Sequence, residues 1–420
     1  MQPLRGTRDI LPDEIKLWQY IYNKANNLFS KNNYHEIQTP ILENTELFKR
    51  SIGNFTDIVN KEMYSFNDQG KRNITLRPEG TASIARAFIS NKLYLKKKIN
   101  RLWYLGPMFR YERPQKGRQR QFHQLGVECI GSSIAMADTE VIKLATKMLQ
   151  TLGCKEYILE INSIGNLEER EIYTINLIKY LNKYKNELDI DSTKRIENNP
   201  LRILDSKDYR TQEILKEGPK LKNYLKHESL KHFNEVCENL EYLNIKYTLN
   251  SNLVRGLDYY NYTAFEIKTK KLNHQNTICG GGRYDSLIKQ LGGPDTPSVG
   301  WAIGLERVLM IIENNLIINN DNNIIYIATE INNNYYLVWD IINILEEYEL
   351  KFDLDLSNKN LNKQLKKANQ AKAKICFILH KEEIKNKYIT IKWLKTSMQQ
   401  TIYLSELRNY LKYLKNYITA

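Results

Sequence analysis

The 420-residue sequence lacks most of the features by which membrane, secreted and metal-binding proteins are recognised. It has no apolar run of about eighteen residues, so we expect no membrane-spanning helix. Residues 1–13 show no basic-then-apolar pattern, which argues against a secretory signal. The five cysteines lie far apart without a C-x-x-C pair, which disfavours a thiolate zinc site or a disulfide framework. We therefore expect a cytoplasmic protein.

Common nucleotide and metal motifs are also missing. No G-x-x-x-x-G-K-[ST] or G-x-G-x-x-G sequence occurs, which disfavours P-loop and dinucleotide-binding folds. The six histidines form no H-E-x-x-H pattern. Only His123 lies within a stretch rich in other candidate site residues, and even there it could simply support a strand.

The charge of the chain is strongly positive. Lysine and arginine number 62 against 48 aspartates and glutamates, a formal charge of +14. A basic surface attracts polyanions and releases their counterions on binding, so a nucleic-acid partner is one explanation. The chain is also rich in Lys, Asn, Ile and Tyr, a bias that genome base composition alone can produce. Charge by itself leaves both explanations open.

The pattern along the chain predicts two domains. Composition is globular, with 42% apolar and 26% charged residues. The asparagine-rich residues 314–323 indicate a linker, so we expect one domain over 1–322 and another over 323–420. Residues of about 168–247 are charged and helix-periodic, which suggests a helical insertion within a sheet domain. In the second domain, strand-like and helical stretches alternate, which is typical of an α/β domain.

Finer patterns predict individual elements. In the first domain we expect a helix capped by Asp138 or Thr139 and a strand over 157–161. In the second domain the expected strands are 324–328, 351–356, 375–379 and 388–394, and the expected helices are 335–348, 360–371 and a final one from 405.

Residues 109–128 form the most informative motif. Two apolar stretches flank a polar connection with Pro114 and Gly117, which predicts a strand–loop–strand hairpin. The loop carries four arginines and a lysine, and guanidinium groups bind phosphate oxygens in a bidentate manner. A solvated loop would explain the arginines alone, but not their ordered succession with glutamate and aromatic residues.

Three further stretches contain candidate site residues. Arg255 and Asp258 lie in the apolar, aromatic residues 253–266, where an unpaired charge is costly, so they either face a ligand or pair with each other. The three glycines of 280–282 permit close approach of a ligand, or simply a turn. Residues 298–309 predict a strand opening through Gly304 into a helix with Arg307 in its first turn, where an arginine reaches phosphate.

These motifs, in this order, resemble the histidyl-tRNA synthetases, a family of class II aminoacyl-tRNA synthetases. Further stretches carry the resemblance, which spans essentially the whole chain: residues 5–12 (RGTRDILP), 76–81 (LRPEGT), 199–207 (NPLRILDSK) and 253–260 (LVRGLDYY). The last is specific to this family. The resemblance implies an α+β fold, with a six-stranded antiparallel catalytic sheet, a helical insertion and a C-terminal α/β anticodon-binding domain.

By resemblance, the chain would convert L-histidine and ATP to histidyl-adenylate and pyrophosphate, and then acylate the 3′ end of tRNA-His. Arg110 and Arg255 would be the catalytic residues, holding the α-phosphate from opposite sides, while Arg307 clamps the distal phosphates. Phe122 would stack on adenine, and Glu112 would orient it. Mg²⁺ would accompany the pyrophosphate oxygens without a dedicated protein cage.

For histidine, the resemblance implies two groups of contacts. The α-amino group would lie near Glu79, Gly80, Thr81 and Gln124. The imidazole would meet Glu128 and Tyr260, with Tyr259 and Arg255 close by. Buried polar groups of this kind reject side chains that cannot satisfy them, by about 10⁴-fold or more, so no editing domain is expected.

The resemblance also implies partners. Arg113, Gln115 and Arg120 are candidates for contact with the acceptor end of tRNA, which gives the positive charge a partner. A homodimer is expected. Tyr262 and Ala264 depart from the family pattern in a tolerable way, whereas the departures at 380–383 and 397–399 weaken any expectation of specific anticodon contacts.

Two alternatives to a synthetase belong to other functional classes. A synthetase-like regulatory subunit of ATP phosphoribosyltransferase would bind histidine without charging tRNA, but typically lacks the C-terminal domain and the catalytic arginines present here. A nonspecific RNA-binding module would explain the charge but not the spacing of glycines and arginines.

Overall fold

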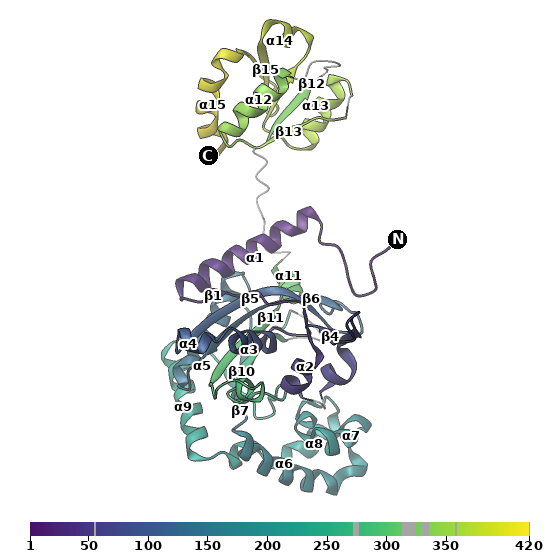
Figure 1. The fold of residues 1–420 in the computed structure, drawn as a ribbon, viewed down its shortest axis with the longest axis vertical. Helices are drawn as coiled ribbons and strands as arrows, with labels where there is room; N and C mark the ends of the chain where they lie inside the picture. The colour runs from purple at the N-terminus through teal and green to yellow at the C-terminus, as the bar shows by residue number, and fades with distance from the viewer. Residues whose placement is uncertain (54–55, 272–276, 313–323, 330–335, 358, 420) are drawn as a thin grey trace. The chain divides into compact units, whose positions relative to one another are not determined.

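The computed structural model describes residues 1–419 except 54–55, 272–276, 313–323, 330–335 and 358. It forms two compact units, Met1–Ile317 and Ile318–Ala420 (Figure 1). The predicted linker, 314–323, lies outside the described residues. Within the described part, no helix has both the length and the apolar character needed to span a membrane.

An eight-stranded sheet forms the centre of the first unit, in the order β1-β5-β6-β11-β10-β9-β7-β8. Its six middle strands run antiparallel, and β1 and β8 each add a parallel strand at one edge. The predicted antiparallel catalytic sheet is therefore confirmed, with one further strand at each edge. The strands are β1 (His35–Glu36), β5 (Asn100–Phe109), β6 (Gln121–Ile130), β7 (Ile158–Ser163), β8 (Thr248–Leu249), β9 (Asn261–Lys268), β10 (Thr277–Arg283) and β11 (Ser298–Gly304).

One face of this sheet is covered by α1 (Pro12–Lys31) and α5 (Ala135–Thr151). Aromatic side chains join the layers, since the Phe29 ring of α1 lies 5.4 Å from Trp103 and 6.0 Å from Trp301. The Trp301 indole donates a hydrogen bond to the Val141 carbonyl of α5 at 2.9 Å. Because strand side chains alternate, Tyr104 and Met108 of β5 point to the opposite face, where they pack with α3 (Thr81–Ser90).

Smaller elements border the opposite face. A three-stranded sheet in the order β2-β4-β3 packs beside α2, and α3 carries the buried Ile84 and Phe88 of the core beneath the sheet. The elements are β2 (Leu42–Asn44), α2 (Thr45–Ile52), the short helix η1 (Ile58–Glu62), β3 (Tyr64–Asn67), β4 (Asn73–Leu76), α3 (Thr81–Ser90), α4 (Leu93–Lys96), α10 (Leu287–Gln290) and α11 (Leu305–Ile312).

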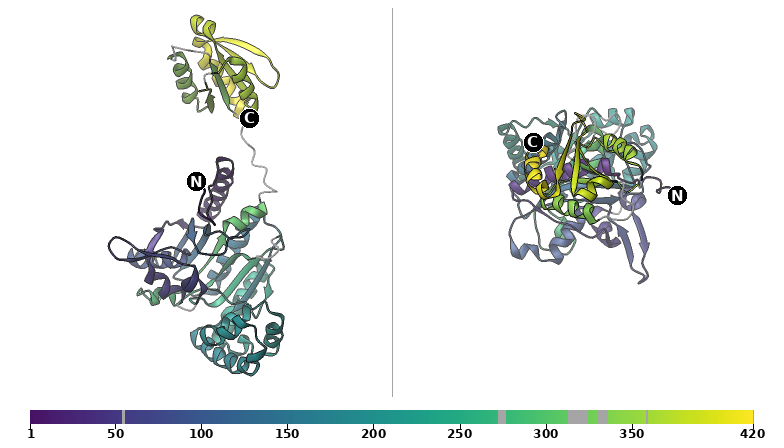
Figure 2. Two further views of the ribbon diagram at one scale, coloured as in Figure 1. Left: turned by 90° about the vertical axis from the view of Figure 1, so that its right-hand side faces the viewer. Right: turned by 90° about the horizontal axis from the view of Figure 1, so that it is seen from above.

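Residues 168–247, predicted to be helical, consist of short helices between β7 and β8. They gather as a cluster beside the sheet, at the bottom of the left view in Figure 2. A capping box of Asn166 and Glu169 starts the first helix, and Tyr173 and Leu177 are buried in the cluster. The helices are α6 (Leu167–Leu181), η2 (Asn182–Glu187), α7 (Ile190–Asn198), η3 (Pro200–Asp205), α8 (Tyr209–Glu217), η4 (Leu221–Tyr224) and α9 (His227–Tyr242).

The second unit is an α/β structure around a five-stranded sheet, ordered β13-β12-β14-β15-β16. β12 pairs in parallel with β13 and β14, while β15 and β16 continue the sheet antiparallel. The predicted strands and helices are confirmed to within a few residues, but α14 and β16 were not predicted. The elements are β12 (Ile325–Thr329), α12 (Tyr336–Glu347), β13 (Phe352–Leu354), α13 (Leu361–Gln370), β14 (Ile375–Leu379), α14 (Lys381–Asn386), β15 (Tyr388–Trp393), β16 (Gln399–Tyr403) and α15 (Leu404–Thr419).

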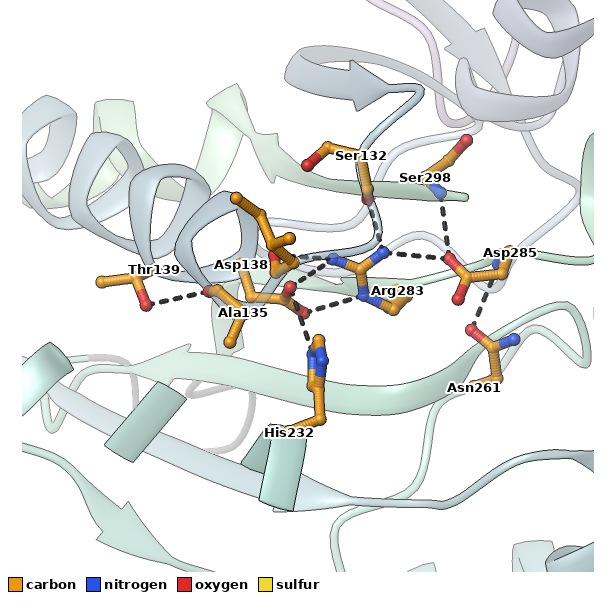
Figure 3. Close-up of polar contacts among 10 residues, drawn as sticks. Ser132, Ala135, Asp138, Thr139, His232, Asn261, Arg283, Asp285 and Ser298 are labelled. Carbon is orange, nitrogen blue, oxygen red and sulfur yellow. Dashed lines mark hydrogen bonds and ion pairs between the residues drawn. The ribbon is translucent and has the colours of Figure 1, made fainter. Parts of the chain in front are cut away.

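The predicted cap of α5 is wrong. The helix begins at Ala135, and Asp138 lies inside it, fully buried. Its carboxylate pairs with the buried Arg283 of β10, whose guanidinium also donates to the Ser132 carbonyl at 2.8 Å and to Asp285 at 3.1 Å (Figure 3). Asp138 therefore neutralises a buried charge from inside the helix. Sequence patterns near the helix cannot reveal this pairing.

Candidate active site

The face of the sheet opposite α1 and α5 carries a cavity of about 320 Å³. Stretches of chain that are distant in sequence form its walls: β6, the start of α3, residues 253–260 and the start of α11. Ten of the residues predicted for the site line it: Glu79, Thr81, Arg110, Glu112, Phe122, Gln124, Arg255, Tyr259, Tyr260 and Arg307.

Strand alternation explains how β6 supplies this wall. Phe122 and Gln124 point into the cavity, and Glu128 continues the same face beneath it. His123 points to the other face, where its ring lies 4.5 Å from Trp18 and its Nδ1 lies 3.1 Å from a carboxylate oxygen of Glu306. His123 thus supports the strand and does not enter the cavity.

Five predicted residues do not line the cavity. Gly80 packs closely against Tyr104, and Glu128 is fully buried below the cavity. Gln115 forms a bridge with Arg118 across the hairpin loop. The Arg120 guanidinium lies 3.8 Å from the Tyr111 ring centroid, and its backbone N–H donates to Gly6. Arg113 is exposed on the same loop.

Arg255 is held firmly at the centre of the cavity. Its guanidinium pairs with Glu266 of β9, with side chains only 14% and 17% exposed. The Thr277 hydroxyl donates to the other oxygen of Glu266 at 3.0 Å. A side chain on Gly280 would collide with the Arg255 guanidinium, so a glycine is needed there. The alternative that Arg255 pairs with Asp258 is wrong, because Glu266 is its partner.

The glycines of 280–282 are not in a turn. They lie within β10, which passes directly under the site. Gly280 leaves room for Arg255, and Gly282 leaves room for the Tyr260 ring. Their lack of side chains therefore brings functional groups close to the sheet, and they do not form a phosphate-binding loop.

Arg110 follows the end of β5 and crosses the rim of the cavity. Its Nε donates to the Pro78 carbonyl at 2.9 Å, and its guanidinium carbon lies 5.3 Å from the Phe122 ring centroid. Glu112 pairs with Arg118 at 2.5 Å and lies 3.9 Å from Arg110. Arg110 and Phe122 thus present a cation and an aromatic face to the same space.

Arg307 completes a positively charged end of the cavity. One of its terminal nitrogens donates to the Thr277 carbonyl at 2.5 Å, and its Nε donates to Gly117 at 3.4 Å. Burial, followed by repulsion from Arg118 and Arg110, lowers the pKa of Arg307. An anion between these groups would relieve that repulsion, so this end is suited to phosphate.

The other end of the cavity is a buried polar network. The Glu79 carboxylate accepts from the backbone N–H groups of Thr81 at 2.8 Å and Ala82 at 2.7 Å, which places it at the start of α3. The Thr81 hydroxyl donates to Glu128 at 2.8 Å, and the Tyr284 hydroxyl donates to the other Glu128 oxygen. Burial raises the pKa of Glu79, and it raises the pKa of Glu128 to about 8.

Gln124 lies between the two ends with an unused acceptor. The residue is only 9% exposed, and its Oε1 has no hydrogen-bond partner among the described residues. Buried polar atoms without partners are uncommon in folded proteins. This atom is therefore suited to accept from a donor on a ligand, such as an ammonium group.

Several polar residues that line the cavity were given no role, among them Glu62, Arg118, Arg202 and Thr277. Arg118 lay within the arginine-rich loop, and Glu266, the partner of Arg255, ended the second motif without being singled out. Arg202 comes from the 199–207 stretch of the helical insertion and reaches the cavity from the side. Arg118, Arg202 and Glu266 lie in stretches that the sequence had already singled out, which was the available sign of a role. Whether each side chain points toward the cavity depends on tertiary contacts.

The described residues of the cavity do not form a binding site for a divalent metal ion by themselves. Among the described residues, no group of three or more His, Cys, Asp or Glu side chains is arranged to hold one. Of the carboxylates that line the cavity, Glu112 is engaged by Arg118, and Glu79 by two backbone N–H groups of α3. Mg²⁺ fits here only if phosphate oxygens and water supply most of its ligands, which is its usual preference.

Comparison with known proteins agrees with this geometry. The family model described as Histidyl-tRNA synthetase matches residues 6–308, and that described as Anticodon binding domain matches residues 321–414. The chloroplastic histidine–tRNA ligase of Gracilaria tenuistipitata var. liui is 62% identical over 96% of this chain and 95% of its own length. The histidine–tRNA ligase of Acaryochloris marina is 48% identical, over 100% of this chain and 98% of its own.

A solved structure extends the match to three dimensions. The apo histidyl-tRNA synthetase of S. aureus superposes with a TM-score of 0.80 at 35% identity, covering 98% of this chain and 99% of that chain. The sequence matches and the shared fold therefore lead to one conclusion: this chain belongs to the histidyl-tRNA synthetase family.

Proposed function

We propose that this chain activates L-histidine with ATP and transfers the histidyl group to the 3′ end of tRNA-His. One observation carries the proposal: arginines from three distant segments meet at one end of a cavity whose other end is a buried polar network. The first end suits a polyphosphate, and the second suits a small polar amino acid. ATP and histidine would therefore lie in contact, as adenylate formation requires.

At the phosphate end, Arg110 and Arg255 would hold the α-phosphate as the histidine carboxylate attacks phosphorus and pyrophosphate leaves. Arg307 would bind the distal phosphates. Negative charge moves onto the leaving oxygens during this step, and cations already fixed in place stabilise it without reorganisation. The pairing of Arg255 with Glu266 supports this role, because it holds the guanidinium still before substrate arrives.

Phe122 would stack on the adenine ring, and Glu112 would orient the base through its position beside Arg110 and Arg118. Bound Mg²⁺ would neutralise charge on the pyrophosphate oxygens, and the carboxylate of Glu112, which lines the cavity, would be placed to assist. Positioning and electrostatics, more than proton transfer, would account for the rate.

At the histidine end, Glu79, Thr81 and Gln124 would receive the α-amino group, with Gly80 keeping the start of α3 close to Tyr104. Tyr259, Tyr260 and Glu128 would form the imidazole site. Glu128 lies one layer below the cavity wall, so we propose that it acts on the imidazole directly after a small shift of Thr81, or by fixing Thr81 and Tyr284.

Arg113, Gln115 and Arg120 would contact the acceptor end of tRNA from the hairpin loop. We further propose that 1–322 is the catalytic domain and 323–420 the anticodon-binding domain. Deleting residues from Asn323 onward should then impair tRNA charging far more than adenylate formation. Equal loss of both activities in a folded truncated protein would contradict this division.

Oligomeric state and compartment are also proposals. We expect a homodimer, measurable by light scattering. The sequence suggests a cytoplasmic enzyme, whereas the red algal relative is named as chloroplastic. We propose that the enzyme works where bacterial-type translation takes place, in a bacterial cytoplasm or a chloroplast.

The direct test is ATP–pyrophosphate exchange with each of the twenty amino acids, followed by charging of tRNA-His. Histidine alone should support exchange. A protein that binds histidine but exchanges no pyrophosphate would instead fit the regulatory-subunit alternative, which the presence of Arg110, Arg255 and Arg307 disfavours.

A further inference from the structure

The 199–207 stretch has no role in the reaction described so far. Its short helix η3 lies against residues 253–258, which carry Arg255. Asn199 donates to the Asp258 carboxylate at 3.4 Å, and the Arg202 guanidinium rests beside Gly256, about 3.1 Å from where a Cβ would lie. Among the described residues of the helical insertion, Arg202 is the one that lines the 320 Å³ cavity.

The position of Arg202 is fixed from behind. Its neighbours Ile203 and Leu204 are buried in the core, at 0% and 7% exposure. The guanidinium donates a hydrogen bond to Asp205 at 3.2 Å, and the two side chains are 24% and 41% exposed. Ion pairs that solvent can reach contribute little stability, so this one can be exchanged for another anion at small cost.

The other four arginines of the cavity have partners of their own. Arg255 is paired with the half-buried Glu266 and Arg118 with Glu112, while Arg110 is fixed by the Pro78 carbonyl and Arg307 by the Thr277 carbonyl. Arg110, Arg255 and Arg307 face the space proposed for ATP. Arg202 approaches from the insertion, beyond Arg255, and is therefore available to a second phosphate-bearing substrate.

We propose that Arg202 binds the phosphodiester of the 3′-terminal nucleotide of tRNA. The ribose hydroxyl that accepts histidine must enter the cavity, so the phosphate of the same nucleotide has to come to rest at its rim. A guanidinium fork binds phosphate oxygens through two parallel hydrogen bonds, which fixes orientation as well as position. This inference rests on the proposed function and adds a tRNA contact from the insertion.

The phosphates of ATP have the same chemistry, so the test separates the two sources. The variants are Arg202→Gln and Arg202→Lys. Arg210→Gln is the matched control, because Arg210 lies in the same insertion, pairs with Glu187 and Glu213, and does not line the cavity. Pyrophosphate exchange reports on ATP, and single-turnover transfer from preformed enzyme-bound adenylate reports on tRNA.

Arg202→Gln should leave exchange within about twofold of the wild type and weaken tRNA binding in the transfer step by about 10-fold or more, as expected for loss of a charged hydrogen bond. The slope of log affinity for tRNA against log salt should fall by about 0.7, one phosphate contact to a single strand. Arg202→Lys should keep the salt slope and lose part of the affinity, and Arg210→Gln should behave as wild type.

Two results would overturn the proposal. A raised KM for ATP in exchange, as large as the effect on tRNA, would assign Arg202 to the nucleotide. Transfer by Arg202→Gln equal to that of the control would exclude any phosphate contact. If Arg202→Gln does not fold, the partial loss of tRNA affinity in Arg202→Lys is the result that decides, and affinity equal to that of the control would contradict the proposal. Failure of the wild type to exchange with histidine would instead refute the proposed function.

Discussion

The two ends of the cavity are built in opposite ways. At the histidine end, Glu79, Thr81, Glu128 and Tyr284 are all buried, at 3%, 6%, 0% and 1% exposure, and are bonded to one another. At the phosphate end, the side chains of Arg110 and Arg118 are 20% and 41% exposed. One end is dry and preformed, and the other is charged and partly hydrated.

This difference fits the role proposed for each end. Selection of one amino acid requires polar groups that would be left unpaired by a wrong side chain, and that penalty is large only away from water. Guanidinium groups, in contrast, bind phosphate even when they are partly exposed. Arg255 lies where the ends meet, and it combines burial with charge through Glu266.

The largest loss of activity is expected from Arg255→Ala. Losing one fixed cation at the reacting phosphate should lower histidine-dependent exchange by about 10²-fold or more. Exchange kinetics measure this, and thermal unfolding must show that the variant folds although Glu266 has lost its partner. Unchanged exchange in a folded variant would remove Arg255 from the mechanism.

A smaller effect is expected from Glu128→Gln, which alters the buried end alone. It should lower kcat/KM for histidine by about 10- to 100-fold, since the amide cannot reproduce both hydrogen bonds that Glu128 accepts from Thr81 and Tyr284, and leave the KM for ATP nearly unchanged. Glu140→Gln is a matched control, because Glu140 pairs with Arg101 away from the cavity. Equal effects on both substrates would mean that the ends are not independent.

Phe122→Leu tests the opposite end with a milder change. Loss of an aromatic surface for adenine should raise the KM for ATP by about 3- to 10-fold, and the KM for histidine should stay near its original value. Steady-state exchange at varied ATP measures this. A larger effect on histidine than on ATP would reverse the assignment of the two ends.

The last prediction concerns the pH dependence of stability and not the rate of exchange. Glu128 ionises near 4.5 when unfolded, and burial raises its pKa to about 8 in the folded protein. Between these values the folded state keeps a proton that the unfolded chain releases. The wild type should therefore lose stability relative to Glu128→Gln as pH rises from about 4.5 to about 8, by on the order of 1 kcal/mol per pH unit, and no further above that. Urea unfolding of both proteins at three pH values measures this, and parallel curves would contradict it.

Local patterns predicted many of the helices and strands, whereas the residues of the site were predicted by the family resemblance. Helix periodicity placed the final helix within one residue of α15, and the resemblance named Phe122 and Gln124, which line the cavity from β6. The start of α5 was predicted wrongly, because Asp138 pairs with Arg283, which lies 145 residues further along the chain, and does not cap the helix. No pattern near the helix carries that information.

The order of residues shows which groups the chain offers: four arginines in one loop, an arginine within an apolar, aromatic stretch, and three successive glycines. Folding sets which of these groups meet. Arg255 was paired with Glu266 and not with Asp258, Glu128 was set beneath the cavity wall, and Arg202 was brought in from the insertion. The reason is physical: local conformation depends on neighbouring residues, whereas the pairing of a buried charge depends on whichever group folding brings beside it.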